Sequence, residues 1–99
     1  MNRPAPLQSL SPNLYRQITM KLEDEYHIHP YDIQIFGTEN EDGIHVTVSY
    51  GSQFSHQADQ FFTHQELDDG NSKIDSFIEK TGIQCREVMI DDYFKKMTP

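Results

Sequence analysis

The side chains best suited to catalysis or metal binding are five histidines spread over the middle of the chain. His27 and His29 would share one side of an extended segment, and His45, His56 and His64 lie on or near predicted strands. Histidines beside carboxylates are typical ligands of zinc or nickel. However, the sequence has no HExxH motif and no paired cysteine and histidine spacing. We therefore expect scattered surface histidines and no bound cofactor, with a small histidine-based metal-binding protein as the lowest alternative.

Cys85 is the only cysteine, which excludes an internal disulfide. It would act as a nucleophile only if the fold brought a histidine to it. A lone cysteine on a predicted strand is usually a small buried apolar group. The sequence also lacks the GxSxG, SxxK, P-loop and GxGxxG motifs. We therefore expect no catalytic residues and no enzymatic activity.

The acidic side chains form two local groups that favour recognition. One group falls in the last turn of a predicted helix, where the helix dipole disfavours negative charge, and the other surrounds a predicted hairpin turn. The two groups are Glu23, Asp24 and Glu25, and Glu39, Glu41 and Asp42. Charge runs are usually ordinary solvated surface, but a group that opposes its own dipole is where a functional compromise would show. We predict that the six carboxylates merge into one negative surface that binds a basic protein partner.

The overall charge narrows the possible partners. Sixteen acidic residues against eight basic ones give a net charge of −8. The longest basic run is Lys95-Lys96, so the chain lacks the cations that neutralise phosphates, and direct nucleic-acid binding is not expected. The same charge repels an anionic membrane surface and favours a basic protein. Since there is no 18-residue apolar run and no stretch typical of a signal peptide, we expect no membrane association and a cytoplasmic location.

The elements that must position these side chains begin after residues 1–10, which contain two prolines and predict a flexible or extended arm. Ser11 as N-cap and Pro12 at the first helical position predict the start of a helix. Apolar residues then recur every four positions and predict one buried stripe, made by Leu14, Ile18, Leu22 and Tyr26. The predicted helix covers Pro12 to about Tyr26, and His29-Pro30 stops it, because proline pushes the residue before it out of the helical region.

An antiparallel hairpin is the clearest pattern in the chain. Residues 31–36 and 44–50 alternate apolar and polar side chains, as half-buried strands do, and Asp42-Gly43 suits the turn between them. The side chains expected to face the core are Ile44, Val46, Val48 and Tyr50, and those expected to face outward are His45, Thr47 and Ser49.

Residues 54–67 fit either a strand or a helix, and we favour a third strand because two strands alone do not make a stable sheet. The rest predicts a turn over 68–71, a helix from Ser72 that Gly82 terminates, a returning strand over 83–90 and a short helix over 91–96. The expected fold class is α+β, with a mainly antiparallel sheet of three to four strands and helices on one face. The expected order is α-β-β-β-α-β-α within a single domain over residues 11–99.

These observations lead to three functional hypotheses. The first is a small acidic cytoplasmic interaction or regulatory protein that binds a protein partner through its acidic surface. The alternative is an inhibitor that mimics nucleic acid and occupies the basic groove of a DNA- or RNA-binding protein, and the last is the metal-binding protein described above. A homodimer is a further possibility, because Met89, Tyr93 and Met97 form a stripe that belongs either to the core or to a dimer contact.

Overall fold

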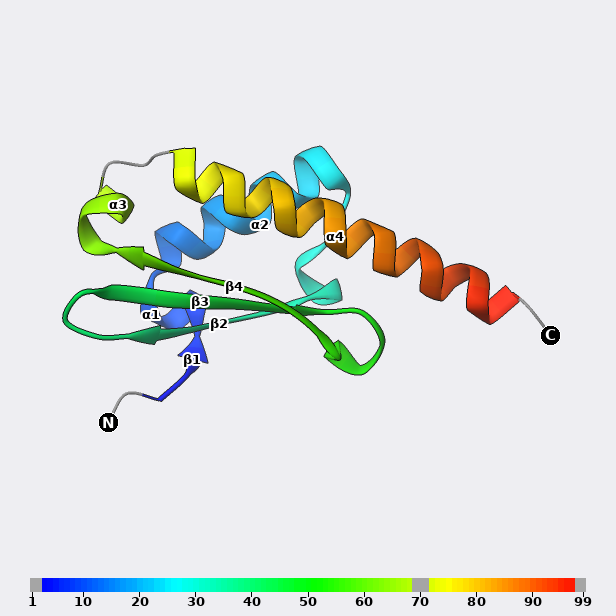
Figure 1. Cartoon of the computed structure of the whole chain (residues 1–99), viewed down its shortest axis with the longest axis horizontal. Coiled ribbons are helices and arrows are strands. Elements are labelled where there is room, and N and C mark those ends of the chain that lie inside the picture. Colours follow the sequence, from blue (N-terminus) through cyan, green and yellow to red (C-terminus); the bar gives the residue numbers. More distant parts are fainter. Residues whose placement is uncertain (1–2, 69–71, 98–99) are drawn as a thin grey trace.

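The computed structural model describes residues 3–68 and 72–97. Along the chain its elements are β1 (Ala5–Pro6), α1 (Leu7–Leu10), α2 (Pro12–Tyr26), β2 (Gln34–Glu39), β3 (Gly43–Tyr50), β4 (His56–Thr63), α3 (His64–Asp68) and α4 (Ser72–Met97). The strands form one antiparallel sheet in the order β1-β2-β3-β4. The long helices α2 and α4 contact each other and lie on one face of that sheet (Figure 1). The predicted α+β class, with an antiparallel sheet and helices on one face, is confirmed.

The hairpin between β2 and β3 forms as the alternation predicts. Ile44, Val46, Val48 and Tyr50 are buried beneath the helices. At the turn, the Asn40 side-chain oxygen accepts hydrogen bonds from the backbone N–H groups of Asp42 at 2.8 Å and Gly43 at 3.1 Å. Gly43 is required because a Cβ there would overlap the Phe62 carbonyl oxygen on β4.

Residues 54–67, which fitted either a strand or a helix, form both. The strand β4 covers His56–Thr63, as favoured, and the short helix α3 follows it directly. A capping box marks the change from strand to helix. Glu66 Oε1 accepts the Thr63 N–H at 2.9 Å, and the Glu66 N–H donates to Thr63 Oγ1 at 3.1 Å. The turn predicted at 68–71 lies mostly outside the described residues.

The returning strand predicted over 83–90 is wrong, as is the helix end predicted at Gly82. A single helix, α4, runs from Ser72 to Met97 and includes the short helix predicted over 91–96. Its buried residues recur every three or four positions and continue past the glycine, which is a helical period. These buried residues are Ile74, Phe77, Ile78, Thr81 and Cys85.

The fourth strand comes instead from the N-terminal residues, where a flexible or extended arm was predicted. From Ala5 onward they belong to the fold. Ala5 pairs with Gly37 and Pro6 with Phe36, so β1 forms one edge of the sheet. Leu7 follows with 0% of its surface exposed, because its side chain packs into the core cluster. This one apolar anchor outweighs the prolines that favoured an arm.

The helix α2 ends at Tyr26, as predicted, but His27 and not His29-Pro30 stops it. His27, with φ of 57°, adopts the left-handed conformation that stops the helix, and the N–H groups of His27 and Ile28 bond the carbonyls of Glu23 and Leu22. Ser11 makes no side-chain capping bond at the other end. Because Pro30–Asp32 form a 3₁₀ turn, β2 begins at Gln34, three residues later than predicted. Within the described residues, no helix is long and apolar enough to cross a membrane.

Candidate functional site

The structure does not bring the two predicted acidic groups together. Glu23, Asp24 and Glu25 occupy the last turn of α2, and the segment after α2 leads into the start of β2. The second group, Glu39, Glu41 and Asp42, sits at the far end of β2, in and beside its turn with β3. A strand of six residues spans about 20 Å. The single merged negative surface predicted from the sequence is therefore wrong, and each group must be judged separately.

The group at the β2–β3 turn borders a shallow polar depression lined by residues 39–42, and Glu39 also lines a second depression of about 330 Å³ with Leu10 and Ile44. Its backbone is fixed by the Asn40 side chain, so the loop is an ordinary tight turn. Both depressions at this group have mainly polar walls. The group at the end of α2 has different surroundings.

At the end of α2 the three carboxylates of Glu23, Asp24 and Glu25 are exposed. In the described part of the chain, no lysine, arginine or histidine lies within ion-pair distance of any of them. They also lie at the negative end of the helix dipole, which adds to their mutual repulsion. This turn of α2 is therefore a place where an incoming cation would be stabilised.

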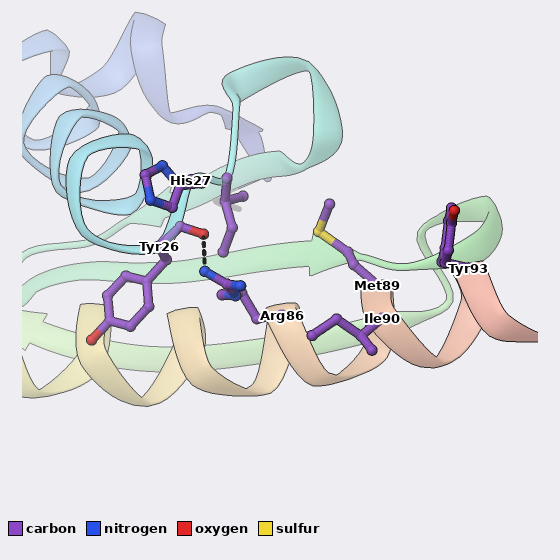
Figure 2. Close-up of a pocket in the computed structure, with 7 residues that line it drawn as sticks. Tyr26, His27, Arg86, Met89, Ile90 and Tyr93 are labelled. Atoms are coloured by element: carbon purple, nitrogen blue, oxygen red, sulfur yellow. Dashed lines mark hydrogen bonds between the residues drawn. The ribbon is translucent and has the colours of Figure 1, made fainter.

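Directly beside this turn is a hollow of about 350 Å³ between the end of α2 and the outer half of α4 (Figure 2). Its walls are mainly apolar, and its lining residues are Tyr26, His27, Ile28, Arg86, Met89, Ile90 and Tyr93. Figure 2 shows the α4 side chains Arg86, Met89, Ile90 and Tyr93 following one another along the helix beyond Tyr26.

The hollow exists because the two packed helices differ in length. With 15 residues α2 extends about 22 Å, whereas α4 with 26 residues extends about 39 Å. The outer part of α4 therefore projects past the end of α2 (Figure 1). There, Ile90 is 47% exposed and Tyr93 61% exposed. An apolar helix surface left uncovered beside a helix end offers the space that a further helix or a large apolar side chain would fill.

Tyr26 and Arg86 line the hollow and join the end of α2 to α4. Tyr26 lies against Gly82 of α4, and its carbonyl oxygen accepts a 3.3 Å hydrogen bond from Arg86 Nη1. A guanidinium at the last carbonyls of a helix satisfies an unpaired acceptor and suits the dipole. Burial raises the pKa of the Tyr26 phenol, and the negative charges of Glu79 and Glu25 raise it further. The raised pKa favours the neutral phenol.

The histidines are distributed over the described surface and do not converge. His27 lines the hollow, His29 stacks on Tyr31 and His56 stacks on Tyr50. His45 Nε2 lies 2.7 Å from Asp59 Oδ2 on the sheet face away from the helices. Within residues 3–68 and 72–97, no three histidine, cysteine, aspartate or glutamate side chains are close enough to hold a metal ion.

Cys85 is buried, with 1% of its surface exposed, and its Sγ lies 3.6 Å from Met89 Sδ. Burial raises the pKa of the thiol to about 11, and the charge of Asp32 contributes to the rise. A nucleophilic cysteine needs the opposite shift, toward the thiolate. The side chain therefore fills space between α4 and the sheet.

Sequence reasoning singled out Glu23, Asp24 and Glu25 but did not predict the hollow beside them. The stripe of Met89, Tyr93 and Met97 contained a signal, since the first two line the hollow; the Met97 side chain lies outside the described part of the structure. Arg86 gave no signal, because its role depends on where α2 ends. Comparison with family models, curated proteins and solved structures gives no match.

Proposed function

We propose that the protein acts by binding a basic protein partner at the end of α2, as a small interaction or regulatory protein. The observation that carries the proposal is the closeness of two features along the chain: Glu23, Asp24 and Glu25 are exposed and come directly before Tyr26, which lines the apolar hollow. An apolar anchor flanked by charge is the usual arrangement of a protein recognition site, where the anchor supplies most of the affinity and the charges supply specificity and speed.

The expected partner segment carries a large apolar side chain next to lysine or arginine. The apolar group would enter the hollow against Met89 and Ile90, while the cation would meet the carboxylates of the last α2 turn. A helical segment fits this description well, because the outer half of α4 would lie alongside it as the first half of α4 lies alongside α2. We also propose a cytoplasmic location, since one free buried thiol suits a reducing compartment.

The alternative, mimicry of nucleic acid, draws less support from the arrangement. A mimic needs a continuous row of carboxylates that replaces successive phosphates, and the acidic groups are divided between opposite ends of β2. A metal-dependent function likewise draws no support from the positions of the described histidines.

The test compares capture of partners from the native cell extract by immobilised full-length chains. One variant reverses the charges at the proposed site (Glu23→Lys, Asp24→Lys, Glu25→Lys), and a matched variant makes the same change at the other end (Glu39→Lys, Glu41→Lys, Asp42→Lys). A third variant, Ile90→Asp, places a charge on the apolar wall. We expect the Glu23, Asp24 and Glu25 variant and the Ile90→Asp variant to fail to capture proteins that the Glu39, Glu41 and Asp42 variant still captures.

The salt dependence of the captured complexes provides a second readout. Because apolar contact is screened little by salt, the proposed complex should weaken only moderately with ionic strength. Equal capture by all three variants, or a loss confined to the Glu39, Glu41 and Asp42 variant, would contradict the proposal. Complete elution by moderate salt would favour the mimic instead.

A further inference from the structure

The strand β4 forms one edge of the sheet, on the opposite side from β1. The sheet order places β1 and β4 at its two edges. Edge strands present unpaired backbone groups, and proteins usually protect them with prolines, lysines, bulges or very short strands. The two edges of this sheet differ sharply in that respect.

The β1 edge is protected. It is two residues long, its second residue is Pro6, and Pro4 comes just before it. A strand this short that includes proline cannot continue a hydrogen-bond ladder. Growth of the sheet on this side is therefore blocked.

The β4 edge lacks every one of these devices. It is eight residues long and contains no proline, glycine, lysine or arginine. All eight residues pair in unbroken register with β3, from Tyr50↔His56 to Gly43↔Thr63, so there is no bulge. Gln57 and Asp59 are exposed along it. The edge is thus long, regular and open.

The hydrogen-bond pattern identifies which backbone groups point outward. The His64 N–H bonds the Asp42 carbonyl, whereas the Thr63 N–H bonds the Glu66 side chain. In an antiparallel pair, hydrogen-bonded and non-hydrogen-bonded residue pairs alternate along the strand. The backbone N–H and C=O groups of the even-numbered residues of β4 therefore bond β3, and those of the odd-numbered residues point away from β3. Thr63 is capped by Glu66, which leaves the outward N–H and C=O groups of Gln57, Asp59 and Phe61 without a ladder partner among the described residues.

Charge indicates what occupies this edge. Two copies of a chain with a net charge of −8 repel each other over most of their surfaces. On β4 the single carboxylate is Asp59, and His45 Nε2 lies 2.7 Å from it. This edge therefore carries little of the negative charge that makes two copies repel, and an antiparallel strand paired with its own copy satisfies the same groups on both chains.

We propose that β4 pairs with β4 of a second copy of this chain, joining two four-stranded sheets into one antiparallel sheet of eight strands. The blocked β1 edge then limits the assembly to a closed dimer, since neither outer edge can add a further copy. The interface is separate from the hollow at the end of α2, so each dimer carries two such hollows.

The direct test is the mass of the full chain in solution, measured by light scattering during size exclusion, together with amide exchange. We expect twice the chain mass of 11.6 kDa. We also expect the outward N–H groups of Gln57, Asp59 and Phe61 to be protected from exchange at high protein concentration and to lose that protection on dilution. A monomer at every concentration, or fast exchange of these three amides in the dimer, would overturn the proposal.

Variants at Gln57 separate this edge from other dimer contacts. Gln57→Pro removes one outward N–H and no bond to β3, so it should halve the mass while circular dichroism shows a folded chain. If that variant unfolds, Gln57→Lys is used, because lysine at an edge disfavours pairing. Gln34→Lys is the matched control. Gln34 on β2 and Gln57 on β4 both pair with Ser49 of β3, so they lie in one cross-strand row on either side of that strand. A dimer that persists in the folded Gln57 variants, or is lost equally in Gln34→Lys, would contradict β4 pairing.

Discussion

Tyr26 at the end of α2 lies with its ring directly over Gly82 in the middle of α4. A Cβ at residue 82 would come within 2.6 Å of Tyr26 Cδ2 and 2.8 Å of Cε2. The glycine therefore permits the close crossing of the two helices, and it does not end the helix in which it lies. Through this contact, the position of Tyr26, and with it the floor of the hollow, depends on one missing methyl group.

The first prediction follows from that contact. In an exposed helix position, Gly→Ala stabilises by about 1 kcal/mol. Here the added methyl group would push the Tyr26 ring away, and overpacking of this kind costs about 1–3 kcal/mol. We expect Gly82→Ala to lower the free energy of unfolding measured with urea. The double variant Tyr26→Ala, Gly82→Ala provides the control, because adding Gly82→Ala to Tyr26→Ala should no longer destabilise. Stabilisation by Gly82→Ala alone would contradict the crossing.

The second prediction concerns Leu7, which lies where the sequence predicted an arm. Its side chain is fully buried in the core cluster. Replacing a buried leucine by alanine costs about 2–5 kcal/mol. We expect Leu7→Ala to lower the free energy of unfolding by this amount, measured by urea denaturation. Gln8→Ala, at an exposed neighbouring position, should change it little. An equally small effect of both substitutions would mean that residues 1–10 behave as an arm after all.

The parts of the fold that the sequence predicted correctly depend on local patterns. In β3 the alternation of Ile44, Val46 and Val48 determines which face is buried, and the Asp42-Gly43 pair determines where the chain turns. Such patterns are repeated over several residues, so tertiary contacts do not change their meaning. The first helix was predicted for the same reason.

The wrong predictions fall at residues whose type suits two different structural roles. Gly82 terminates many helices, but here it allows the approach of Tyr26, which is distant in sequence. If a helix ends at this glycine, the β-branched residues that follow favour a strand. The site shows the same limit: the charges of Glu23, Asp24 and Glu25 are visible in the sequence, whereas the hollow results from the unequal lengths of two packed helices.

The third prediction tests the junction between β4 and α3. The Thr63 N–H and Lys73 lower the pKa of the Glu66 carboxyl. A group whose pKa is lower in the folded state stabilises the fold above its unfolded pKa, and this stabilisation is lost as the pH falls through the folded value. We expect the wild type to be more stable than Glu66→Gln at neutral pH, with the difference shrinking below the ordinary carboxyl value of 4.5. Urea denaturation at a series of pH values measures it, and a difference that stays constant with pH would contradict the shift.

The fourth prediction concerns Cys85, whose contribution to stability is lost as the pH rises and not as it falls. Burial raises the pKa of its thiol from 9.0 to about 11. The folded state therefore favours the neutral thiol, and the unfolded state ionises first as the pH rises. The thiol contributes fully to stability below pH 9.0 and loses that contribution between pH 9.0 and about 11.

Two measurements check this behaviour of Cys85. The stability of the wild type should fall more steeply than that of Cys85→Ala between pH 9.0 and about 11, since the variant shares every other titrating group. At neutral pH the thiol should react with a disulfide reagent only as fast as the chain opens, because the thiolate is the nucleophile and burial disfavours it. Adding urea below the unfolding transition should then accelerate the reaction. A thiol that reacts in the native protein as fast as a free cysteine would show that residue 85 does not lie on the buried face of α4.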